Sequence, residues 1–159
     1  MISLNQIVNK VQEIADQHYM VKSFDAGSIS QIDLKDQSGD LLYPRVFLHR
    51  QNASSTGGAL YYNFELVVTD LVQDDRSNEQ EVISDCMQIA TDFVTLLERP
   101  EYLGQNADSF LNPSQTINYG FLSEEYSDRV SGVVVTFQIK QGFDYNKCIT
   151  PVTGGTGNC

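Results

Sequence analysis

The chain has 159 residues and is acidic, because 21 Asp and Glu against 10 Lys and Arg give a formal net charge of −11. This charge argues against nucleic acid or an anionic membrane as the main binding partner, since both are polyanions. With 41% hydrophobic residues, the chain can build the core of a single domain, and its apolar runs are far shorter than the ~18 residues of a membrane span.

The N-terminal segment predicts an amphipathic helix. Apolar side chains recur at helical spacing over residues 4–17, and Ser3 with Gln6 makes a capping box at the start. The segment Met1–Lys10 has neither the basic start nor the continuous apolar stretch of a secretion signal. We therefore expect synthesis in the cytoplasm.

A short hairpin is expected next. Tyr19–Asp25 and Ser28–Leu34 are rich in β-branched and aromatic residues, and Ala26-Gly27 lies between them where a turn would join two strands. Turn signals follow at Ser38-Gly39-Asp40. This pattern predicts two short strands that pair with each other.

A longer hairpin is predicted after Pro44. The run Arg45–Gln51 precedes a Ser/Gly-rich break at Asn52–Gly58, and in Leu60–Leu71 a strongly apolar strand face alternates with a mixed one. About twelve extended residues span roughly 40 Å, comparable with the diameter of a domain of this size. The tip of this hairpin is therefore expected to protrude.

A second helix follows the long hairpin. Ser77 with Gln80 makes another capping box, and the helix should end near Arg99, before Pro100. Its predicted buried face consists of Val82, Cys86, Ile89, Ala90, Phe93 and Leu97. The polar segment Glu101–Gln115 is predicted to be a loop.

Two strands, Thr116–Leu122 and Asp128–Gln141, complete the pattern. The apolar face of the second consists of Val133, Val135, Phe137 and Ile139. The element order predicts an α+β fold in one domain, residues 1–145, in which two amphipathic helices pack against an antiparallel sheet with a long protruding β-hairpin. Residues 146–159 are interpreted as a C-terminal extension or arm.

The histidines and cysteines form no catalytic pattern. His18 ends the first helix, where a cation complements the helix dipole, and His49 lies in a strand with no second histidine nearby. Cys86 lies on the apolar face of the second helix, where a thiol acts as a small, inert hydrophobe. Cys148 and Cys159 do not form a closely spaced pair. We therefore predict reduced thiols and no catalytic residue.

Five acidic residues gather before and within the start of the second helix: Asp70, Asp74, Asp75, Glu79 and Glu81. Hard cations such as Ca²⁺ take several oxygen ligands from such loops, but the sharp glycine and the distant bidentate Glu of a calcium loop are missing. A solvated turn followed by a helix N-terminus explains the acids instead. The sequence predicts no metal and no cofactor.

The long hairpin suggests a surface for protein contacts. Leu60, Tyr61 and Tyr62 follow its Ser/Gly-rich tip, while Arg45 and Arg50 lie on the facing strand. Tyr and Arg are enriched at protein interfaces, so these five residues are the candidate inter-subunit interface. The alternative is that the tyrosines only cover the sheet, and the pattern favours neither.

Three segments in this order carry a family resemblance: the run Tyr62–Asp70, the helix Ser77–Glu98 and the late strand Gly132–Lys140. Together they resemble the tail-terminator or tail-completion proteins of tailed bacteriophages. The resemblance covers most of residues 1–145 and rests on element order and residue texture, since that family has no catalytic motif.

The resemblance implies a structural virion protein without enzymatic activity. In the family a single α+β domain assembles into a closed ring that terminates the tail or joins it to the head-side neck. The implied partners are further copies of the chain and neighbouring neck, portal-adaptor or tail proteins, while DNA passes through the ring without being specifically bound. Residues 146–159 depart from the family pattern. From another class, the alternative is a small cytosolic ligand-binding or regulatory α+β domain.

Overall fold

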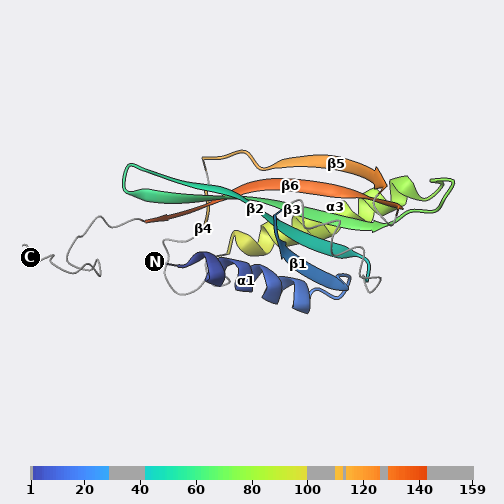
Figure 1. Ribbon diagram of the computed structural model, residues 1–159, viewed down its shortest axis with the longest axis horizontal. Helices are drawn as coiled ribbons and strands as arrows, with labels where there is room; N and C mark the ends of the chain where they lie inside the picture. The colour runs from blue at the N-terminus through green and yellow to red at the C-terminus, as the bar shows by residue number, and fades with distance from the viewer. Residues whose placement is uncertain (1, 29–41, 100–109, 113, 126–128, 143–159) are drawn as a thin grey trace, which may run out of the picture.

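A computed structural model describes residues 2–28, 42–99, 110–112, 114–125 and 129–142. In chain order and with the labels of Figure 1, they form α1 (Leu4–Gln17), β1 (Ser23–Gly27), β2 (Arg45–Thr56), β3 (Ala59–Leu71), α3 (Glu79–Leu97), β4 (Phe110–Leu111), β5 (Asn118–Glu125) and β6 (Arg129–Gly142).

The strands of the described residues form one six-stranded sheet in the order β1-β2-β3-β6-β4, with β5 also paired to β6. β1 runs parallel to β2, and the other pairs are antiparallel. The two helices of the described residues lie on the same face of the sheet (Figure 1) and share one core with it. The predicted α+β class is therefore confirmed, although the sheet is mixed rather than purely antiparallel.

The first helix has the predicted bounds and start. Ser3 Oγ accepts a hydrogen bond from the Gln6 N–H (3.3 Å), and the Ser3 N–H donates to Gln6 Oε1 (2.7 Å), so the capping box is present. These bonds stabilise a helix start whose first amides have no partner within the helix. The buried face of α1 consists of Ile7, Val11, Ile14 and Ala15.

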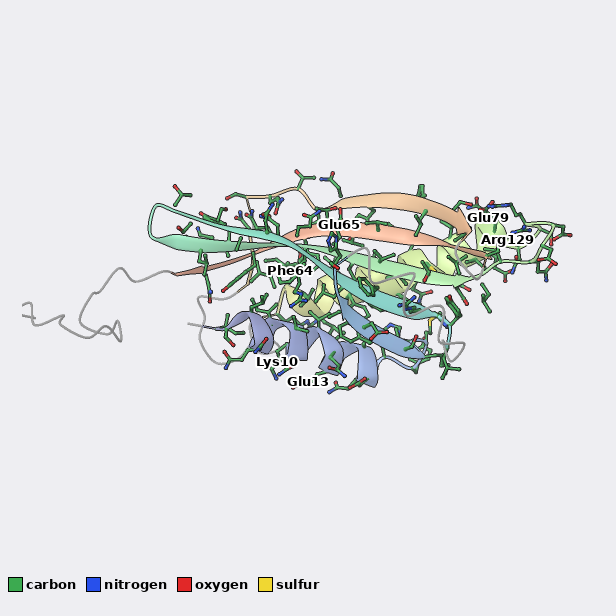
Figure 2. The ribbon with its side chains drawn as sticks, viewed as in Figure 1. Lys10, Glu13, Phe64, Glu65, Glu79 and Arg129 are labelled. Carbon is green, nitrogen blue, oxygen red and sulfur yellow. The ribbon has the colours of Figure 1, made fainter. Side chains whose placement is uncertain are left out.

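One core lies between the two helices and the sheet. The predicted face of α3 is buried in full: Val82, Cys86, Ile89, Ala90, Phe93 and Leu97. Opposite it lie Phe64, Leu66 and Val68 of β3, and Val133, Val135, Phe137 and Ile139 of β6. The rings of Phe64 (Figure 2) and Phe137 stack with their centres 5.6 Å apart. Both predicted apolar strand faces are thus confirmed.

A second, smaller apolar cluster lies on the other face of the sheet. Phe47 and Val67, which pair across β2 and β3, are buried there, and Leu122 and Val134 pack against them. Because side chains alternate along a strand, these residues point away from the helices. We call this the open face of the sheet, and the helix-covered side the helix face.

The predicted short hairpin is wrong. Ala26 and Gly27 do not form a turn but are the last residues of β1, where they pair with Leu48 and His49 of β2. The strand therefore runs parallel to a partner that comes later in the chain. Nearly all of the second predicted strand, from residue 29 onward, lies outside the described residues.

The long hairpin has a tighter turn than predicted. β2 continues to Thr56, so most of the predicted break at Asn52–Gly58 belongs to the strand. Only Gly57 and Gly58 form the turn, with φ angles of 57° and 76°. Two successive residues with positive φ match a two-residue hairpin loop, and glycine adopts this conformation without a Cβ penalty.

The second helix starts later than the sequence predicts. Asn78 precedes Glu79 as the N-cap, and its side chain makes no capping bond. Ser77 stays outside the helix, because its N–H donates to Asp75 Oδ1 (3.0 Å) and its hydroxyl donates to Gln73 Oε1 (2.7 Å). The predicted capping box at Ser77 is therefore wrong, since local turn bonds occupy the serine.

The last part of the chain contains one strand that the sequence did not predict. α3 ends at Leu97, two residues before Arg99, near which the sequence predicts its end. Phe110–Leu111 lie in the predicted loop but form β4 by pairing with Lys140 and Ile139 of β6. β5 and β6 confirm the last two predicted strands. The C-terminal extension lies outside the described residues.

Candidate assembly surface

The hairpin of β2 and β3 projects beyond both helices. We define the arm as its distal part, Arg50–Phe64, together with Phe137–Gly142 of β6. Figure 1 shows the hairpin tip extending past the start of α1 along the longest axis of the molecule. β6 accompanies β3 to its first residue, since Ala59 pairs with Gly142. The arm is therefore three-stranded, which is more stable than an isolated two-stranded hairpin.

The predicted residues Leu60, Tyr61 and Tyr62 all lie on the arm and are partly exposed. Tyr62 packs against the main core, with its ring centre 6.4 Å from that of Phe64, so it lies on the helix face. Tyr61 lies opposite Lys140 on the open face. The structure therefore divides the two tyrosines between the faces of the sheet.

The predicted place of Arg45 on the arm is wrong, whereas Arg50 does lie there and is exposed. Arg45 is the first residue of β2 and is only 3% exposed. Its guanidinium carbon lies 5.6 Å from the centre of the Phe47 ring, and its Nη2 lies 3.8 Å from Asp25 Oδ2. Arg45 thus stabilises the base of the sheet within one copy of the chain.

A row of amide side chains crosses the open face at the base of the arm. Asn63 donates to Asn52 Oδ1 (2.6 Å), Gln138 donates to Asn63 Oδ1 (2.8 Å), and Asn112 donates to Gln138 Oε1 (2.6 Å). The row links β2, β3, β6 and the residue after β4, which fixes the relative positions of the strands. The sequence alone does not predict this row, because its contacts depend on strand register.

A groove of about 380 Å³ lies beside the arm where β1 ends at Gly27. β1 pairs with β2 only up to His49, so the described residues leave the outer edge of β2 unpaired from Arg50 to Thr56, and all seven of these residues are exposed. Leu4, Ala53, Tyr62 and Phe64 are among the residues that line the groove. The groove thus continues the line of β1 along an open strand edge.

The opposite side of the sheet has a second open edge. Within the described residues β5 pairs with β6 alone, which leaves its outer edge without a strand. Phe121 in the middle of β5 is 73% exposed. Unpaired edges and exposed aromatic rings are typical of contact sites with another chain.

The two histidines make structural contacts. His18 is the C-cap of α1, as predicted, and its Nε2 lies 3.1 Å from Asp92 Oδ2 of α3. His49 Nδ1 lies 2.9 Å from Glu65 Oε2, its cross-strand neighbour on the open face. Each pair joins two elements of the fold, and neither histidine has a nucleophile beside it among these contacts.

Glu79 ties the start of α3 to the end of the sheet that lies away from the arm (Figure 2). Its Oε1 accepts hydrogen bonds from Ser123 Oγ (2.6 Å), Ser131 Oγ (2.7 Å) and Arg76 Nη1 (2.9 Å). The bonds from Ser123 and Ser131 lower the pKa of the Glu79 carboxyl below its usual range. One of the predicted acidic residues therefore joins elements of the fold.

Charge differs between the two ends of the molecule. The arm carries Arg50 and Lys140 and no acidic residue, whereas residues 70–85 carry six acids and only Arg76. In Figure 2, Glu79 lies at the end of the molecule opposite the hairpin tip. Among the residues that the structure describes, the arm is therefore basic and the opposite end is acidic.

The Cys86 thiol is expected to be unreactive in the folded protein. Burial raises its pKa to about 12, so at pH 8 only about 10⁻⁴ of it is thiolate, the reactive form. Iodoacetamide should leave Cys86 unmodified in the native chain and modify it in urea, as measured by mass spectrometry of the peptide. Labelling of the native chain at the rate of a free cysteine would contradict this burial.

Among the described residues, no three His, Cys, Asp or Glu side chains are grouped to hold a metal ion. No helix of the described part is long and apolar enough to cross a membrane. Comparison of the chain with known protein families and with curated protein sequences found no match.

Proposed function

We propose that this chain is a structural virion protein that forms a ring at the neck or head-proximal end of a bacteriophage tail. The observation that carries the proposal is a sheet whose described strands leave two different edges open, with an arm that projects past the helices. A closed ring needs each copy to offer two complementary patches that differ from each other. Its partners are copies of itself and neighbouring neck, portal-adaptor or tail proteins.

The charge distribution supports a ring that DNA passes without being held. A net charge of −11 repels phosphate groups, which favours passage over binding. The acid-poor arm and the acidic opposite end give each copy a polarity along its long axis. Rings built from such copies have two chemically different rims, as joining two different neighbours requires.

Light scattering after size-exclusion chromatography, with negative-stain microscopy, tests the proposal. The expected result is a closed ring with a central channel, formed alone or on purified tail tubes of the virus that encodes the chain. A strictly monomeric chain under both conditions would overturn the ring function. Genes for portal, tube or tape-measure proteins beside this gene are a further expected finding.

The groove beside the arm favours the alternative, a small ligand-binding domain. Its volume of about 380 Å³ falls within the range of small-molecule pockets. A monomeric chain whose melting temperature rises with one compound of a metabolite set would support this alternative. A ring that gains no stability from any of them would count against it.

The arm is predicted to be needed for assembly but not for folding. Replacing Asn52–Tyr61 with an Asn-Gly turn removes one buried residue, Ala59, and otherwise only exposed or half-exposed residues. The variant should show cooperative thermal unfolding and sediment as a monomer. Loss of the unfolding transition would contradict the prediction, as would a variant that still forms rings.

A further inference from the structure

The two open strand edges of the sheet are complementary to each other. We propose that β5 of one copy pairs with the outer edge of β2, Arg50–Thr56, in the next copy, so that the sheet continues from subunit to subunit. The contact rests on the proposed ring function and names the surfaces that build the ring. A second copy is the occupant because the same chain offers both halves.

Strand direction makes this pairing antiparallel. β3 runs opposite to β2, β6 opposite to β3, and β5 opposite to β6. β5 therefore runs opposite to β2 within one copy. In a ring whose copies all face the same way, β5 of the neighbour keeps this direction and meets β2 in the antiparallel arrangement.

The side chains of the two edges also belong to matching faces. Phe121 pairs with Val133, a core residue, so it lies on the helix face of β5. Tyr62 and Phe64, which line the groove, lie on the same face of the arm. A continuous sheet with the helices of both copies on one side therefore places the exposed Phe121 ring over the aromatic wall of the groove, where it is shielded from water.

Length and charge agree with one register. The free edge of β2 has seven residues and β5 has eight. The register of β2 shifts between Arg50 and Asn52, so antiparallel pairing beyond this bulge that sets Ala53 opposite Phe121 joins Asn52–Thr56 to Asn118–Leu122. Segment 50–56 carries one arginine and no acid, whereas segment 118–125 carries two acids at its end and no base. The two segments therefore carry opposite charge, which favours their contact.

The contact also fixes how the copies are offset. β5 pairs with residues 129–136 of β6, level with the first part of β2, whereas the free edge of β2 lies farther along the strand. Each copy is therefore displaced along the strands by about seven residues, roughly 23 Å. A closed ring accommodates such a stagger when its strands tilt, as in β-barrels.

Disulfide cross-linking tests the register. Ala53→Cys and Phe121→Cys are combined in a chain that also carries Cys148→Ser and Cys159→Ser. Directly opposed residues of an antiparallel pair are close enough for a disulfide, so oxidation should yield a ladder of covalent oligomers. Each single-cysteine variant should give nothing larger than a dimer, and so should Ala53→Cys with Tyr19→Cys, since the exposed Tyr19 lies next to the C-cap of α1 rather than on either edge.

A charge substitution tests the same contact without cross-linking. Phe121→Asp should raise the concentration needed for assembly at least about tenfold. Tyr19→Asp, at a side chain that is 82% exposed, is the matched control and should leave assembly unchanged. If Phe121→Asp still forms rings and the Ala53→Cys/Phe121→Cys chain gives no ladder, the contact is wrong but the proposed ring function is unaffected. If the double-cysteine chain gives no ladder and the unmodified chain does not assemble in solution, the contact is wrong. The ring function is overturned only if the unmodified chain also forms no ring on tail tubes.

Discussion

Phe93→Ala is expected to lower the free energy of unfolding by about 3 to 5 kcal/mol. The Phe93 side chain is fully buried in the core between α3 and the sheet, and its ring centre lies 6.1 Å from that of His18. Its removal exchanges packed contacts for a cavity that the close-packed neighbours fill only in part, so the lost transfer energy and the cavity cost add. Urea unfolding followed by circular dichroism measures the change as a shift of the midpoint at constant slope.

Phe121→Ala is the matched control for this substitution. Phe121 is 73% exposed, so below the concentration at which copies assemble its loss should change stability by no more than about 0.5 kcal/mol. Equal effects of the two substitutions would contradict the burial that separates the phenylalanines. A cost near zero at Phe93 would mean that the buried face of α3 is assigned wrongly.

The elements that could be predicted from the sequence are those specified by their own residues. α1 has a side-chain cap at Ser3, an apolar stripe of the right period and no competing partner, so its bounds follow from local signals. The apolar face of β6 follows in the same way from alternation. Such elements need no knowledge of what packs against them.

β1 and the start of α3 depend on contacts that no local pattern specifies. Ala26-Gly27 has the composition of a turn, but pairing with Leu48 and His49 keeps both residues extended. Ser77 has the spacing of a cap, but the nearer bonds to Asp75 and Gln73 hold it outside the helix. In both places a tertiary or turn contact is stronger than the sequence preference.

The candidate assembly surface could be predicted only in part, because some of its features depend on contacts between strands. The places of Arg50 and the tyrosines could be predicted because they follow from the hairpin itself. The burial of Arg45 also depends on the neighbouring strand, since Asp25 of β1 meets it there, and no local pattern specifies that pairing. The free edge of β2 is defined by the point at which β1 ends. Strand order and edges are properties of the whole sheet, so alternation along one strand cannot predict them.

Gly132→Ala is the other substitution with a large expected effect, and the reason lies in the middle of the same sheet. Gly132 belongs to β6 and pairs with Thr69 of β3 on one side and Leu122 of β5 on the other. A Cβ at this position would overlap the carbonyl oxygen of Val68 and lie 2.9 Å from the Cα of Thr69. These are main-chain atoms, so a side-chain rotation cannot relieve the clash.

We therefore expect Gly132→Ala to cost about 3 kcal/mol or more, at the upper end of overpacking, because β3 and β6 must separate along the centre of the sheet. Alanine also restricts the unfolded chain, which offsets the cost by no more than about 1 kcal/mol. Gly120→Ala is the matched control: on the neighbouring β5 a Cβ would meet its nearest atom, Val134 O, at 3.9 Å, so stability should be unchanged or slightly higher. Urea midpoints of the two variants, measured side by side, decide the point. A Gly132→Ala chain as stable as the Gly120→Ala chain would mean that β3 and β6 do not approach each other this closely. It would also contradict the continuous sheet on which the arm and both open edges depend.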